Sequence, residues 1–285
     1  MHIGLHSLGI GNGAVREIID VVARTAESVG FHTLWSGEHV ALFDDPVSRY
    51  PYAPDGRISV APDERWLDPM ITLAFAAAAT SSIQLGTGIL LLPEHNPVIM
   101  AKQIASLDQL CGGRFRLGIG IGWSREEFAA LGVPFNDRAV RTEHQVAAMR
   151  EIWRNDIASY ASEYVSFTRI RVSPAPIDRN VPIIVGGNSD AALARVARWG
   201  DGWYGFNLAD VQAAEERLTK LRSSCEDADR SFKDLYIAVA LRTPHPNDLT
   251  TLTDLGVDEL VLVDTPPDTA PEAQHWVESL ATTWL

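Results

Sequence analysis

Regular alternation of strand-like and helix-like segments is the feature that most limits how this chain can fold. Eight short apolar runs are each followed by a stretch with helical periodicity. The runs cover 2–8, 33–36, 83–90, 114–122, 181–187, 201–206, 235–241 and 259–264. Such alternation predicts parallel strands covered by helices, and eight units predict an α/β fold of the (β/α)8 TIM-barrel type, formed by one domain over 1–285. Alternation and prolines at 162–177 predict a small hairpin insertion.

Glycines gather where three of these strands end, at 86–90, 118–123 and 185–189. The active site of a barrel lies at the carboxyl ends of its strands, and glycine there lets a bound group approach the backbone. Gly186, Gly187, Asn188 and Ser189 also precede a helix and would suit a phosphate. Each cluster alone could equally be a set of turn residues. Their position on one rim favours a cofactor site.

A second glycine motif supports a different fold. "GIGNGA" at 9–14 follows the first strand and precedes a helix, and Glu38 ends the second strand. This arrangement matches a dinucleotide-binding fingerprint and makes an NAD-dependent Rossmann dehydrogenase an alternative. Glu38 lies later than that fingerprint requires, and the strand–helix units continue through eight.

Composition excludes several classes of function. The net charge is −13 without a segregated basic face, which argues against a nucleic-acid partner. No apolar run approaches the ~20 residues of a membrane span, and the N-terminus has no signal-peptide pattern. Cys111 and Cys225 are far apart, and the histidines lack metal-ligand spacing. We therefore expect a cytoplasmic protein with a small-molecule substrate and no metal.

The glycine-rich segments carry a resemblance to a known family. "LGTGILLLPEHNP", "GGRFRLGIGIGW" and "VPIIVGGNSDAALARVARWGDGWYG" resemble the bacterial luciferase-like monooxygenase superfamily. More narrowly, the chain is similar to actinobacterial oxidoreductases that depend on coenzyme F420, a deazaflavin. The resemblance covers nearly all of the chain and implies a barrel with an insertion, a flavin or deazaflavin across the strand ends, and a homodimer.

The same resemblance assigns residues to the cofactor. It implies a cis peptide between Gly88 and Ile89 that backs the central ring, and a phosphate site at the fifth strand. The cofactor-binding residues expected in this way are Gly88, Ile89, Gly120, Gly122, Trp123, Gly186, Gly187, Asn188 and Ser189. Sugar-phosphate dehydrogenases of the superfamily have a glutamate where this chain has Trp123. This departure favours a more apolar pocket, covered by a lid at 43–66 that contributes Tyr50 or Tyr52.

Glu38 and His39 are the expected catalytic residues, because "SGEHV" places both directly after the second strand. In relatives that use the deazaflavin, a histidine at this position lies near the reactive carbon. Imidazole can exchange a proton near neutral pH, and Glu38 could hold its tautomer. The alternative is that the two side chains only satisfy loop backbone groups. His6 on the first strand is a weaker candidate for the cavity.

We expect an oxidoreductase that transfers a hydride between F420 and a small, apolar or planar organic substrate. Deazaflavin serves as a hydride carrier, whereas FMN would permit monooxygenation, and the family branch favours the deazaflavin. The alternatives are an FMN-dependent monooxygenase, the Rossmann dehydrogenase and a flavin-binding barrel without catalysis. A metal-dependent hydrolase is disfavoured by the histidine spacing.

Overall fold

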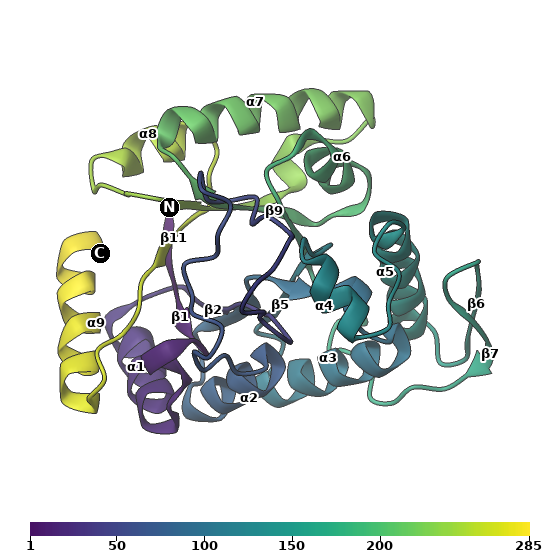
Figure 1. The fold of residues 1–285 in the computed structure, drawn as a ribbon, viewed down its shortest axis with the longest axis horizontal. Coiled ribbons are helices and arrows are strands. Elements are labelled where there is room, and N and C mark those ends of the chain that lie inside the picture. Colours follow the sequence, from purple (N-terminus) through teal and green to yellow (C-terminus); the bar gives the residue numbers. More distant parts are fainter.

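A computed structural model describes residues 1–285 and contains a closed parallel barrel (Figure 1). Eight strands form it, in the spatial order β3-β2-β1-β11-β10-β9-β8-β5, and pairing of β3 with β5 closes the ring. These strands are β1 (His2–Leu8), β2 (Thr33–Ser36), β3 (Gln84–Thr87), β5 (Phe115–Gly120), β8 (Ile183–Gly186), β9 (Gly202–Leu208), β10 (Tyr236–Leu241) and β11 (Glu259–Val263). All eight expected strands are confirmed. The two-residue strand β4 (Leu90–Leu91) follows β3 and also pairs with β5.

Helices surround the barrel, as the alternation in the sequence predicted (Figure 1). They are α1 (Arg16–Val29), α2 (Pro69–Ala79), α3 (Pro97–Cys111), α4 (Arg125–Ala130), α5 (Arg138–Arg154), α6 (Asp190–Trp199), α7 (Val211–Asp227), α8 (Asp248–Asp254) and α9 (Ala270–Trp284). None of them is both long and apolar enough to cross a membrane.

Local sequence explains where several helices begin and end. Asp68 caps α2 by accepting a hydrogen bond from the Ile71 N–H, and Pro69 occupies the first helical position. Asn96 and Pro97 start α3 in the same way. Helix α1 ends at Gly30, whose φ of 99° is left-handed and suits glycine best.

Two segments depart from the simple barrel repeat. The expected hairpin insertion is present as the antiparallel pair β6 (Ala158–Ala161) and β7 (Ser166–Ile170), which lies at the periphery (Figure 1). The segment 43–66 contains no helix or strand and crosses the barrel opening, where it is drawn in dark blue in Figure 1. It therefore covers the end of the barrel at which the strands β2, β3, β5 and β8 finish.

The closed barrel shows that the Rossmann alternative is wrong. The "GIGNGA" motif forms a short 3-10 helix at Gly11–Ala14 after β1. Gly13 is required there for packing, because a Cβ would lie 2.1 Å from the carbonyl oxygen of Ser7. Close packing against β1, rather than dinucleotide binding, therefore accounts for Gly13 in this motif.

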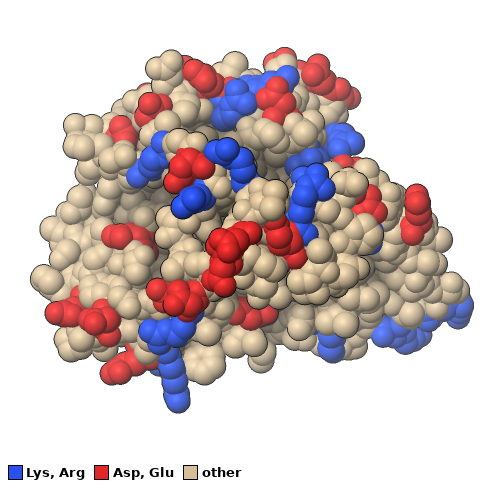
Figure 2. All heavy atoms as spheres, viewed as in Figure 1, with Lys and Arg blue, Asp and Glu red and all other residues tan.

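Charged side chains do not separate by sign on the lid side of the molecule. Figure 2 shows acidic and basic groups interspersed around a central hollow. This agrees with the absence of a continuous basic face in the sequence.

Candidate active site

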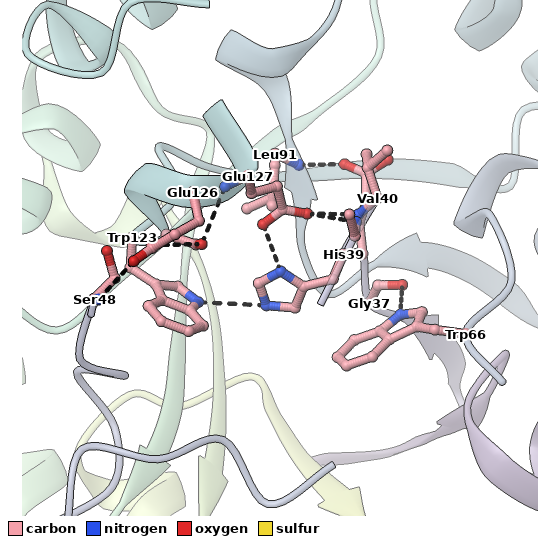
Figure 3. A network of polar contacts seen from close by, with 12 residues as sticks. Gly37, His39, Val40, Ser48, Trp66, Leu91, Trp123, Glu126 and Glu127 are labelled. Atoms are coloured by element: carbon pink, nitrogen blue, oxygen red, sulfur yellow. Dashed lines mark hydrogen bonds and ion pairs between the residues drawn. The ribbon is translucent and has the colours of Figure 1, made fainter. Parts of the chain in front are cut away.

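His39 lies just beyond β2, with its ring enclosed by two indoles and a carboxylate (Figure 3). Its Nδ1 is 2.8 Å from Oε2 of Glu127, and the indole N–H of Trp123 donates to its Nε2 at 3.3 Å. Both contacts are satisfied at once by a neutral ring with its proton on Nδ1. Nε2 then carries the lone pair, so it is the nitrogen able to accept a proton.

Glu127, on α4, is the residue that holds His39 in place, and the sequence analysis missed it. The side chain is fully buried, and its other oxygen accepts hydrogen bonds from the N–H groups of Val40 (2.6 Å) and Ala41 (3.1 Å). One carboxylate therefore fixes the imidazole and the backbone that follows it. Ser124 and Glu127 have the spacing of an N-terminal capping signal, which could have indicated the start of α4.

Glu38 points away from His39, so the expectation that Glu38 orients the imidazole is wrong. Its Oε1 lies 2.9 Å from Nε2 of His95, and its Oε2 accepts the Leu91 N–H at 2.6 Å. Burial alone would lower the pKa of His95, but the hydrogen bond and the charge of Glu38 raise it. Glu38 thus joins β2 to β4 and to the segment after it.

A cavity of about 360 Å³ lies beside His39 at the carboxyl ends of the strands. Its floor includes Gly88 and Ile89, which are joined by the expected non-proline cis peptide bond. Aromatic side chains from the rim and from the lid form much of the wall: Tyr50, Tyr52, Trp66, Trp123, Tyr204 and Phe206. The site is therefore suited to a flat ring system and an apolar or planar compound.

The lid is attached to α4 as well as to the aromatic wall. Glu126 accepts hydrogen bonds from the N–H groups of Val47 (2.7 Å) and Ser48 (3.0 Å). Tyr50 packs edge-on against Trp123, with ring centroids 5.3 Å apart. Neighbouring residues of one short helix, Glu126 and Glu127, thus hold the lid and the imidazole.

His6 lies in the cavity wall, as the weaker expectation for it suggested. Its Nδ1 is 3.1 Å from the hydroxyl of Tyr204, whose ring stacks on Trp35 inside the barrel. Burial lowers the pKa of His6 to about 4, so this imidazole is neutral at pH 7. It can therefore accept or donate a hydrogen bond to a ligand without adding charge.

Several rim glycines make room for the chain itself. A Cβ on Gly120 would lie 1.8 Å from Cδ1 of Ile89, and one on Gly186 would lie 2.8 Å from Cγ2 of the same side chain. At Gly122 a Cβ would lie 2.6 Å from the ring of Phe128. Side chains of the protein itself therefore make the close approach at these three glycines. Gly120 and Gly186 make room for Ile89, which lines the cavity, and Gly122 makes room for Phe128.

Segment 186–189 lies at the far side of the same cavity. Gly186 and Gly187 line it, and the φ of Gly187 is 117°, a value that favours glycine. Ser189 caps α6 by accepting the Ala192 N–H, and Asn188 donates to the carbonyl of Phe206 at 2.7 Å. The buried Oδ1 of Asn188 has no partner. The end of the cavity thus meets a helix N-terminus, which fits an anionic group on the ring system.

Some of the site residues expected from the sequence lie together at the cavity. The expected residues that line the cavity are Glu38, His39, Gly88, Ile89, Trp123, Gly186 and Gly187. Gly120 and Gly122 lie behind this lining, while Asn188 and Ser189 lead from it into α6. The lining also includes Tyr204 and Phe206 of β9, which the sequence analysis did not single out.

Comparison with known proteins agrees with this architecture. The family model for luciferase-like monooxygenases matches residues 4–248, and the chain belongs to that family. An uncharacterised protein of Mycobacterium tuberculosis is 35% identical over 263 residues, which cover 91% of both chains. An FMNH2-dependent dimethylsulfone monooxygenase of Pseudomonas putida is 32% identical over 158 residues, covering 54% of this chain and 43% of that protein.

Two solved structures show the fold over nearly the whole length. One is the coenzyme F420 dependent tetrahydromethanopterin reductase from Methanopyrus kandleri, with a TM-score of 0.76, 17% identity and coverage of 99% and 97%. The other is an F420-dependent secondary alcohol dehydrogenase in complex with an F420-acetone adduct, with a TM-score of 0.76, 14% identity and coverage of 99% and 98%. The protein is thus a luciferase-like enzyme whose family and fold include proteins that use F420 or FMN.

Proposed function

We propose that this protein is an F420-dependent oxidoreductase that transfers a hydride between the coenzyme and a small organic substrate of the alcohol or carbonyl class. The observation that carries the proposal is the His39–Glu127 pair at the wall of the aromatic cavity. Hydride transfer at an alcohol or carbonyl carbon requires a proton acceptor or donor at the oxygen. Glu127 fixes the tautomer of His39, and its Nε2 lone pair can take that proton once the Trp123 indole is displaced.

The deazaflavin would supply the ring carbon that accepts or donates the hydride, and Gly88 and Ile89 would support its ring. Nε2 of His39 takes the proton of the substrate hydroxyl as the hydride leaves the adjacent carbon. The Nδ1 proton stays on His39 and is donated to Glu127, whose negative charge stabilises the resulting imidazolium. In the reverse direction Nε2 returns the proton to the carbonyl oxygen. The indole N–H of Trp123 must leave Nε2 when the substrate oxygen binds there.

A specific observation also supports a second candidate, an FMN-dependent monooxygenase. The dimethylsulfone monooxygenase of Pseudomonas putida is more similar in sequence over its aligned segment than either F420-dependent structure is. The aromatic walls and the lid would exclude water for either reaction.

Binding of F420 and of FMN to the purified protein, followed in parallel by fluorescence quenching, separates the two candidates. We expect tight binding of the deazaflavin and turnover with a panel of short secondary alcohols, followed by deazaflavin absorbance. The variant His39→Gln should lose about 10²- to 10⁴-fold in kcat while coenzyme binding is kept. His275→Gln, at an exposed position on α9, is the matched control. Binding of FMN alone would support monooxygenation, and binding of neither coenzyme would refute both candidates.

A further inference from the structure

Arg195 on α6 is a largely buried cation whose guanidinium makes no hydrogen bond within the protein, and its Nε is fully buried. Its side chain is 6% exposed, and none of the hydrogen bonds in the structure comes from its guanidinium. Arg114, which is 9% exposed, shows how a structural arginine is normally satisfied. Its guanidinium donates five hydrogen bonds to Cys111, Thr80, Ile83 and Ala77. Leaving the buried Nε–H group without a partner costs free energy, so the position of Arg195 requires another explanation.

The position of Arg195 places it next to the cavity end at Gly187. Ala192 and Arg195 are three residues apart and so share one face of α6. A Cβ on Gly187 would lie 3.0 Å from the Cβ of Ala192 and 3.7 Å from the hydroxyl of Tyr52. Side chains on a helix lean toward its N-terminus, which brings the guanidinium toward that cavity end. Burial raises the pKa of the Tyr52 phenol, and the positive charge of Arg195 opposes the shift.

Two carboxylates near α6 are already engaged by other arginines. Glu143 accepts a hydrogen bond from Arg198, and Asp190 accepts one from Arg217 at 3.0 Å. Burial lowers the pKa of Arg195, Glu143 opposes this shift, and the positive charges of Arg198 and Arg138 add to it. The carboxylates of Glu143 and Asp190 are thus each shared with another arginine, while Arg195 has no ion pair of its own.

We propose that Arg195 is the side chain that binds the phosphate group of a flavin-type coenzyme, beside Gly187 and the N-terminus of α6 and beneath Tyr52 of the lid. This inference rests on the proposed function, because it assigns the anionic end of the same site. A guanidinium offers a planar pair of donors that matches two phosphate oxygens. The free enzyme carries the cost of the unpaired charge, and the phosphate relieves it on binding.

The assignment is tested with pairs of compounds that carry or lack the phosphate. F420 and FMN are each compared with their phosphate-free forms, the tail-free deazaflavin and riboflavin, by fluorescence quenching. Arg195→Met should weaken binding of the phosphate-bearing coenzyme by about 10- to 100-fold and leave its phosphate-free form unchanged. Arg24→Met, which removes an exposed, ion-paired charge from α1, should change neither. Equal affinity of the wild type and Arg195→Met for the phosphate-bearing coenzyme would overturn this inference and leave the proposed function standing.

Thermal unfolding with inorganic phosphate supplies a readout without any flavin. We expect phosphate to raise the Tm of the wild type and to have less effect on Arg195→Met. In phosphate-free buffer Arg195→Met should melt at or above the wild-type temperature, because an unpaired buried charge is removed. A lower Tm together with an unchanged phosphate response would make Arg195 a structural residue and refute the inference. A phosphate response that depends on Arg195, in a protein that binds neither coenzyme, would keep the anion site and refute the proposed function.

Discussion

Two neighbouring residues at the end of β2 have different roles because their side chains meet different partners. His39 contacts Glu127 and Trp123, whereas Glu38 contacts His95 and the Leu91 N–H. Both residues line the cavity, but only His39 is held by the carboxylate of α4. The chemistry of the site therefore depends on a carboxylate 88 positions away in the sequence from the imidazole it holds.

Glu127→Gln tests that arrangement. The amide can still accept one hydrogen bond, but it lacks the negative charge that stabilises a protonated His39, so we expect kcat to fall by about 100-fold. The substitution is read out by steady-state kinetics, with coenzyme affinity measured separately.

Glu38→Gln is the matched comparison for Glu127→Gln. It keeps an acceptor for the Leu91 N–H, and we expect kcat to fall by less than about tenfold. An equal loss in both variants would return Glu38 to a catalytic role and contradict the geometry.

At the scale of elements, α4 connects the catalytic residue to the lid. Glu126 binds the Val47 and Ser48 N–H groups, and the hydrogen bonds at Ser48 and Val47 lower the pKa of Glu126 to about 2. Because this pKa is depressed, the stabilisation that ionised Glu126 gives the lid is present above about pH 4.5 and is lost as the pH falls through about 2. The lid is thus held throughout the neutral range.

Glu126→Ala should release the lid. Limited proteolysis with trypsin measures this, because Arg49, Arg57 and Arg65 all lie in segment 43–66. We expect cleavage there to become about tenfold faster, since local opening costs roughly 1.4 kcal/mol less. Glu151→Ala, on α5 and away from the lid, should be cleaved in the lid at the wild-type rate. Unchanged cleavage in Glu126→Ala would show that the aromatic contacts of the lid suffice.

The barrel was predictable from the sequence because strand and helix periods repeat eight times, and caps such as Asp68–Pro69 mark the boundaries. Helix α4 was not expected, because its six residues are too short to show a period. The glycines correctly signalled a close approach, but nothing local reveals that Ile89 is the approaching group at Gly120 and Gly186. Side-chain direction after β2 depends on tertiary contacts, so the role of Glu38 could not be derived from its position.

At the scale of the whole molecule, buried ionisable groups make stability depend on pH. Burial, with the charges of Glu127 and Glu38, raises the pKa of Glu94 to about 9, and neither of its oxygens has a partner. Burial raises the pKa of Glu259 to about 7 despite hydrogen bonds that lower it. The homodimer implied by the family resemblance stays a prediction and would add its own dependence on protein concentration.

The direction of the Glu94 effect follows from linkage. The folded-state pKa of Glu94 lies above the ordinary 4.5. The neutral carboxyl therefore contributes fully to the free energy of unfolding below about pH 4.5, and this contribution is lost as the pH rises to about 9. Glu94→Gln removes this ionisation, and we expect it to leave Tm nearly unchanged at pH 5 and to raise it by about 2 °C or more at pH 9. Glu216→Gln, at an exposed position of α7, should show no such pH dependence. If the Tm difference between wild type and Glu94→Gln is the same at both pH values, Glu94 ionises normally in the folded protein. The carboxylate of Glu127 would then have a second anion beside it, which would weaken the case that Glu127 alone provides the charge opposite His39.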